Sequence, residues 1–104
     1  MKLTNKQQIE VLESVLEILS DYDYIAIGIC YAINESLSRN GYPYPYRLTH
    51  VSLLVPLFTR GNAMQFGANE HSSFWWKLDD RQSRIEFTKW MIEQLKNNDD
   101  ETND

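Results

Sequence analysis

The chain has 104 residues, of which 42% are hydrophobic and 12% are aromatic, and its formal net charge is -5. This length fits one domain with one modest core, which self-association would further stabilise. The 10 Lys and Arg residues against 15 Asp and Glu residues argue against broad nonspecific binding to DNA or RNA.

The first predicted element is a helix over residues 5–20. Thr4 and Gln7 have the spacing of a capping box, in which each side chain reaches the backbone N–H of the other residue. Apolar residues cover about half of the helix circumference, a wide arc that predicts contact with two neighbouring elements. These apolar residues are Ile9, Val11, Leu12, Val15, Leu16, Ile18 and Leu19. The charged residues on the opposite stripe are Lys6, Glu10, Glu13 and Glu17.

A second helix is predicted to begin at Asp21 or Asp23 and to end near Arg39, where Asn40-Gly41 is typical of a helix end. Its predicted apolar side comprises Ile25, Ile29, Ala32, Ile33 and Leu37. Its predicted polar side comprises Tyr31, Asn34, Glu35 and Ser38. Residues 25–29 also show the alternation and the β-branching of a strand, so a short strand near residues 25–30 is the alternative.

The segment after the second helix alternates tyrosine with proline. Each Tyr that precedes a Pro is driven to extended geometry, which predicts a connector with polyproline character over residues 42–46. Its tyrosines, Tyr42, Tyr44 and Tyr46, are a candidate surface for docking a partner or stacking on a ligand. The alternative, which the composition favours, is a stiff connector that lays these rings on the domain.

The rest of the central region predicts two short pieces. Thr49 is expected to cap an apolar segment over residues 50–58, in which Pro56 ends a helix at Val55 or kinks it. A strand near residues 51–55 is the alternative. Gly61 and Gly67 bracket a second piece that contains Met64 and Phe66.

The last predicted element is a helix that is capped by Asp79 or Asp80 and ends near Asn97. Its predicted buried face comprises Ile85, Phe87, Thr88, Met91, Ile92 and Leu95. Its predicted exposed face comprises Glu86, Lys89, Glu93 and Lys96. We expect residues 98–104 to form a disordered acidic tail.

Together these elements predict an all-α domain over residues 1–97. We expect a bundle of three to five helices with an irregular central segment, in which the first helix packs on the second and the last. The main alternative is an α+β fold with a small strand pair near residues 25–30 or 51–55.

The strongest candidate site combines Trp75 and Trp76 with Arg81 and Arg84. Arg84 projects into the apolar arc of the last helix, where a guanidinium needs an anion, backbone carbonyls or an aromatic plane. One interpretation is a binding site for a phosphate, a carboxylate or a base. The structural interpretation, which we favour, pairs Arg84 with an acid such as Asp21, Asp23 or Asp79, or places it at a helix C-terminus. In that interpretation the tryptophans close the core.

No catalytic centre, metal site or cofactor is predicted. His50 and His71 are too far apart in sequence to suggest a metal site. Cys30 is the only cysteine, so it forms no internal disulfide, and its apolar neighbours predict an inert buried thiol. The glycines form no phosphate-binding loop. The acidic stripe of Glu10, Glu13 and Glu17 suggests a protein that mimics the charge of nucleic acid. We favour an ordinary solvated helix face, because Lys6 lies on the same stripe, where i,i+4 pairing of opposite charges accounts for part of the pattern.

Residues 74–95 carry a resemblance to known proteins. An aromatic pair and a short acidic turn are followed by Arg84, two further residues, Phe87 and an aliphatic series that ends at Leu95. This pattern resembles the C-terminus of small uncharacterised proteins that bacteriophages and prophages encode, a group that Gly28-Ile29-Cys30 inside a helix also suits. The resemblance implies an accessory protein that binds host machinery, including CRISPR and other defence systems. It assigns no catalytic residues.

We therefore expect a non-enzymatic binding protein, a phage-encoded inhibitor of a host factor or defence system, with anti-CRISPR activity as one form. The alternative is an oligomer that sequesters a nucleotide or another anion with Trp75, Trp76, Arg81 and Arg84. The longest apolar stretch, residues 24–33, is shorter than the roughly 20 residues that a bilayer requires. We expect a protein of the bacterial host cytoplasm that binds neither membrane nor specific nucleic-acid sequences, with a homodimer as one candidate assembly.

Overall fold

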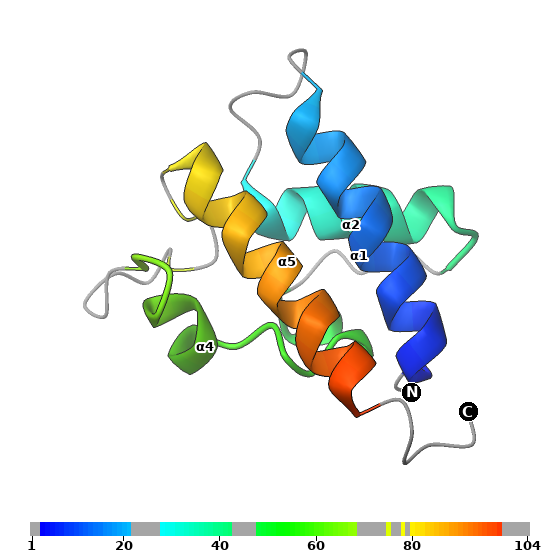
Figure 1. Ribbon diagram of the computed structural model, residues 1–104. Helices are drawn as coiled ribbons and strands as arrows, with labels where there is room; N and C mark the ends of the chain where they lie inside the picture. The colour runs from blue at the N-terminus through cyan, green and yellow to red at the C-terminus, as the bar shows by residue number, and fades with distance from the viewer. Residues whose placement is uncertain are drawn as a thin grey trace.

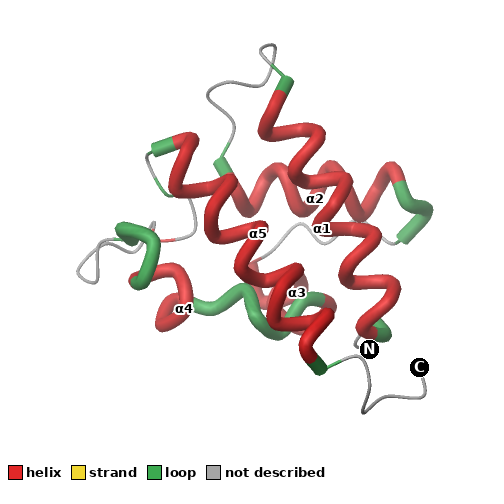
Figure 2. The backbone as a smooth tube through the Cα atoms, viewed as in Figure 1, coloured by secondary structure: helices red, strands yellow, loops and turns green. Residues whose placement is uncertain are grey.

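All regular secondary structure among the described residues is helical (Figure 1). The computed structural model describes residues 3–21, 28–42, 48–68, 75, 78 and 80–98. Its five helices are α1 (Asn5–Ser20), α2 (Ile29–Arg39), α3 (Leu48–Leu54), α4 (Arg60–Met64) and α5 (Arg81–Asn97). Figure 2 shows only helices and loops among these residues. The all-α prediction is confirmed, and the described parts of both strand alternatives contain helix instead.

The start of α1 follows the sequence prediction. The backbone N–H of Thr4 donates to Oε1 of Gln7 at 3.0 Å, and the backbone N–H of Gln7 donates to Oγ1 of Thr4 at 3.1 Å. These reciprocal bonds form the predicted capping box and satisfy two of the backbone donors that a helix start leaves unpaired.

Replacing Thr4 with Ala should lower the free energy of unfolding by about 1 kcal/mol, because the backbone N–H of Gln7 loses its side-chain acceptor. Urea denaturation followed by circular dichroism measures this change. Thr4→Ser retains the hydroxyl and is the matched control. A loss of the same size in Thr4→Ser would show that the hydrogen bond is not the cause.

Two long helices, α1 and α5, lie side by side and antiparallel, and α2 crosses behind them (Figure 1). Nδ2 of Asn5, the first residue of α1, donates to the Leu95 carbonyl of α5 at 3.5 Å. Nε of Arg81, the first residue of α5, donates to the Leu19 carbonyl of α1 at 2.7 Å. Each helix therefore supplies a donor to the carbonyl-rich last turn of the other.

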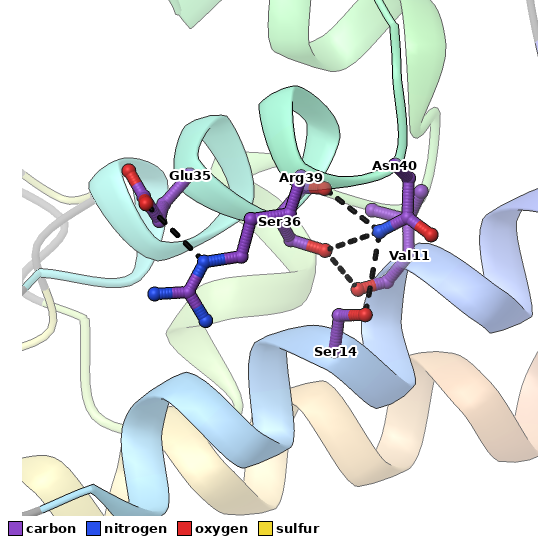
Figure 3. Close-up of polar contacts among 6 residues, drawn as sticks. All are labelled: Val11, Ser14, Glu35, Ser36, Arg39 and Asn40. Atoms are coloured by element: carbon purple, nitrogen blue, oxygen red, sulfur yellow. Dashed lines mark hydrogen bonds and ion pairs between the residues drawn. The ribbon is translucent and has the colours of Figure 1, made fainter.

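The wide apolar arc of α1 contacts both α2 and α5, as its width predicted. Polar bonds fix the position of α2 on α1 (Figure 3). The Ser36 hydroxyl donates to the Val11 carbonyl at 2.6 Å, and Nδ2 of Asn40 donates to the Ser14 hydroxyl at 3.3 Å. Because Ser36 is fully buried, its bond sets the register of the two helices where water is excluded.

The predicted start of the second helix is wrong. Asp21 ends α1 instead, with its backbone N–H bonded to the Ile18 carbonyl at 3.2 Å, and Asp23 lies outside the described residues. Gly28 has an extended backbone and immediately precedes α2, so it does not lie inside the helix as predicted. The helix is shorter than predicted because Gly28 acts as its N-cap.

The predicted end of α2 is confirmed and forms a Schellman motif. The N–H of Gly41 donates to the Ser38 carbonyl at 3.1 Å, and the N–H of Tyr42 donates to the Leu37 carbonyl at 3.0 Å. Gly41 has a φ of 83°, a left-handed conformation that glycine adopts without steric cost.

One residue of the predicted polar side of α2 is buried. Asn34 is only 7% exposed, because α2 is covered by both α1 and α3 and has a wider buried face than predicted. Its Oδ1 accepts no hydrogen bond from the described residues. Gln8 of α1 is also buried, and its Nε2 donates to the Leu3 carbonyl at 2.8 Å. Tyr31 and Ser38 are exposed, as predicted.

The short helices depart from the prediction at their starts. α3 begins at Leu48, so Thr49 lies inside the helix and does not cap it. The helix ends at Leu54, close to the predicted end, because Pro56 disfavours helical geometry at the residue before it. α4 is capped by Thr59, whose hydroxyl accepts from the Asn62 N–H at 3.2 Å, and it includes Gly61 in its first turn.

α5 matches its prediction closely. Asp80 is the N-cap, and its carboxylate accepts from the Ser83 N–H at 3.3 Å. The predicted buried face is confirmed, except that Ile85 is half-buried and that Arg84 joins the buried residues. All four residues of the predicted exposed face are exposed. The predicted acidic tail lies outside the described residues beyond Asn98.

Candidate binding site

Arg84 is buried near the start of α5, with 7% of its surface exposed. Its Nε donates to the backbone carbonyl of Leu78. Leu78 is itself buried and has a φ of 46°, a left-handed conformation that costs a non-glycine residue about 1–2 kcal/mol. Arg84 thus holds the strained backbone of Leu78 against the helix, and a backbone carbonyl is one of the partners that the sequence predicted for it.

Arg81 performs the capping role that the structural interpretation assigned to Arg84. Its bond to the Leu19 carbonyl satisfies a backbone acceptor in the last turn of α1. Both candidate arginines therefore use Nε for internal contacts with backbone carbonyls. These contacts stabilise the fold, and binding of an anion by either residue stays a prediction.

Trp75 belongs to an aromatic cluster, which we define as Phe58, Phe66, Trp75, Phe87 and Trp90. Phe87 of α5 lies at its centre, with ring centroids 6.0 Å from Phe58 and 5.3 Å from Phe66. Trp75 is half-buried and packs on Phe58 at 5.3 Å. This placement agrees with a tryptophan that closes the core, as the structural interpretation proposed. Trp76 lies outside the described residues.

The tyrosine candidates are not brought together with the arginines. Tyr42 is half-buried against the core, directly after the C-terminal end of α2. That end lies on the opposite side of the helical body from the start of α5, where Arg81 lies (Figure 1). Tyr44 and Tyr46 lie outside the described residues. Tyr42 therefore belongs to a different part of the surface from Arg81.

Sequence reasoning overlooked an exposed face of α2 as a candidate site. Tyr31, Glu35 and Arg39 follow one another at four-residue spacing and so share one side of the helix. Tyr31 is 57% exposed, and Nε of Arg39 lies 3.2 Å from Oε1 of Glu35 (Figure 3). We call these three residues the α2 exposed face. The available signal was that Tyr31, a large aromatic residue, fell on the predicted polar side.

Cys30 lies in the first turn of α2 and is buried. Desolvation by this burial raises the pKa of the thiol from about 9 to about 11. Because the thiolate is the reactive form, the thiol is held in its inert state at neutral pH. The expectation of a buried cysteine is confirmed.

The free energy of unfolding should fall as the pH rises from about 9 towards about 11. In this window the unfolded chain releases the Cys30 proton that the folded chain retains, which favours unfolding. Urea denaturation at several alkaline pH values measures the slope. Cys30→Ala should show a smaller slope, since every other titratable group is common to both proteins. Equal slopes would exclude a contribution from Cys30.

The described residues hold no group of three or more His, Cys, Asp or Glu side chains arranged to bind a metal ion. His50 lies in α3, whereas His71 lies outside the described part of the chain. No helix among the described residues is both long and apolar enough to cross a membrane. Comparison with protein-family models, curated protein sequences and solved structures found no match to this chain.

Proposed function

We propose that this chain is a non-enzymatic protein that binds a partner protein through the α2 exposed face. The observation that carries the proposal is Tyr31, a large aromatic side chain that is 57% exposed on a helix otherwise packed against α1 and α3. A partner that covers this ring removes apolar surface from water without breaking a core contact. Tyrosine and arginine are also enriched among the residues that dominate binding energy at protein interfaces.

The surroundings of Tyr31 favour rigid presentation. α2 is fixed to α1 by the buried Ser36 bond and ends in a Schellman motif, so the exposed residues lie on a well-supported helix. Binding to such a surface loses less conformational entropy than binding to a loop. The exposed pair of Glu35 and Arg39 contributes only about 0–1 kcal/mol, so a partner carboxylate can replace Glu35 at little cost.

The resemblance of residues 74–95 to phage and prophage proteins supports the choice of partners to test. Under this proposal the chain acts as an inhibitor that occupies the surface of a host factor. Components of CRISPR and other bacterial defence systems are the first candidates.

The proposal is tested by affinity capture from a bacterial lysate with the wild-type protein, Tyr31→Ser and Leu53→Ser. Leu53 is 59% exposed and provides a matched loss of exposed apolar surface on a different helix, α3. Wild type and Leu53→Ser should capture the same protein, whereas Tyr31→Ser should bind it at least about tenfold more weakly. Unchanged melting temperatures would show that all three proteins are folded. Equal capture by Tyr31→Ser would contradict the proposal.

Ligand titration separates this function from sequestration of a nucleotide or another anion. A sequestering protein should gain about 2.7 kcal/mol of stability when the ligand is at a hundredfold excess over its dissociation constant. For a protein that binds only a partner protein, we expect no change in melting temperature with nucleotides or inorganic phosphate. A stabilising shift that is lost in Arg81→Met would favour sequestration.

A further inference from the structure

The C-terminal end of α2 carries the one Asn–Gly pair in the sequence, Asn40-Gly41. Both residues are exposed, and a Cβ built on Gly41 would meet no heavy atom within 4 Å. Because glycine has no side chain, its backbone nitrogen can approach the side-chain carbonyl of the preceding asparagine with little hindrance. We infer that Asn40 is a site of spontaneous deamidation and that the hydrogen-bonded end of α2 controls its rate.

The reaction uses only these two residues and water. The backbone nitrogen of Gly41 forms a bond to Cγ of Asn40, and the bond between Cγ and Nδ2 breaks. Nδ2 leaves as ammonia after taking the amide proton of Gly41, and a succinimide ring remains. Water then adds to one of the two ring carbonyls. Opening of the ring leaves an aspartate or an isoaspartate at position 40.

Both reacting groups are engaged in hydrogen bonds in the folded protein. Figure 3 shows those of the Asn40 side chain. The Gly41 N–H donates to the Ser38 carbonyl at 3.1 Å. Nδ2 of Asn40 donates to the Ser36 carbonyl at 2.8 Å and lies within 3.4 Å of the Ser36 hydroxyl and 3.3 Å of the Ser14 hydroxyl. Attack requires the end of α2 to open first, so the folded protein reacts only through its locally opened population.

The product does not fit the place that Asn40 occupies. The Asn40 side chain donates to the Ser36 carbonyl, whereas an ionised carboxylate only accepts hydrogen bonds. A carboxylate would also add negative charge at the C-terminal end of α2, where the helix dipole disfavours it. Deamidation therefore removes the side-chain donor to the Ser36 carbonyl and favours the opened state that permitted the reaction.

Peptide mapping by mass spectrometry tests the reaction directly. The full chain is incubated at mildly alkaline pH, with and without denaturing urea, and the peptide that contains Asn40 is followed over time. Deamidation should be at least about tenfold slower in the folded protein than in urea. Equal rates in the two conditions, or no conversion in urea, would overturn the inference.

Asn62 is an internal control for this experiment. Its Nδ2 also donates to a backbone carbonyl, that of Leu57, at 2.8 Å, but Ala63 follows it in place of glycine. Asn62 should therefore retain its amide in both conditions. In urea, where the fold has no influence, Asn40 should deamidate more slowly in Gly41→Ala than in the wild type. If Gly41→Ala reacts as fast as the wild type, the mechanism is wrong.

A second variant tests the effect of the product on the fold. Asn40→Asp should lower the midpoint of thermal unfolding by about 5 °C at neutral pH. Part of this loss should be recovered below pH of about 4, where the carboxyl is protonated and regains a donor. An unchanged midpoint would contradict the role of the amide at the end of α2. Both experiments are independent of the proposed partner binding.

Discussion

Replacing Phe87 with Ala should lower the free energy of unfolding by about 3–5 kcal/mol. Phe87 is fully buried at the centre of the aromatic cluster, where it packs on Phe58, Phe66 and Trp90. Loss of its ring removes the contacts that Phe58 and Phe66 make with Phe87. It also leaves a cavity that the surrounding side chains refill only in part. Urea denaturation followed by circular dichroism measures the change.

Two control variants make the Phe87 result specific. Phe87→Leu retains much of the buried volume and should cost less than Phe87→Ala. Leu53→Ala removes an apolar side chain that is 59% exposed and should change stability by less than about 0.5 kcal/mol. A cost of Phe87→Ala no larger than that of Leu53→Ala would be inconsistent with a core that includes this ring.

Replacing Arg84 with Met should cost about 1–3 kcal/mol of unfolding free energy. Methionine retains the aliphatic stem but removes the donor to the carbonyl of Leu78, a buried residue with a strained backbone conformation. A buried carbonyl without a donor carries the full penalty of its desolvation. The same denaturation experiment applies.

Arg81→Met is the matched control for Arg84. Arg81 is half-buried and also donates Nε to a backbone carbonyl, that of Leu19, but its more exposed position allows water to replace the lost donor. We expect Arg81→Met to cost less than Arg84→Met. The reverse order would show that the bond to the Leu19 carbonyl matters more for stability than the bond to the Leu78 carbonyl.

The long helices could be predicted well because their signals are local. The capping box at Thr4, the N-cap at Asp80 and the apolar arcs behind them all lie within the sequence of each helix. The burial of Asn34 could not be predicted in this way. It depends on which sides of α2 are covered by α1 and α3, which the sequence of α2 does not contain.

The candidate site was predictable only in its chemistry. The position of Arg84 in an apolar arc indicated a buried guanidinium with an internal partner, and the structure provides a backbone carbonyl. The identity of that partner depends on the backbone conformation of Leu78, which no periodic pattern marks. Phe58 and Phe66 were missed as members of the aromatic cluster because they lie in the irregular central region, where spacing carries little information.

The paired contacts at the two ends of α1 and α5 have a consequence for how the protein opens. Because Asn5 binds Leu95 and Arg81 binds Leu19, neither helix can fray at its C-terminal end without releasing the first residue of the other. Amide hydrogens at the paired ends should therefore exchange with solvent through a shared opening, and not as independent helix termini. We therefore expect the antiparallel pair to open as one cooperative unit.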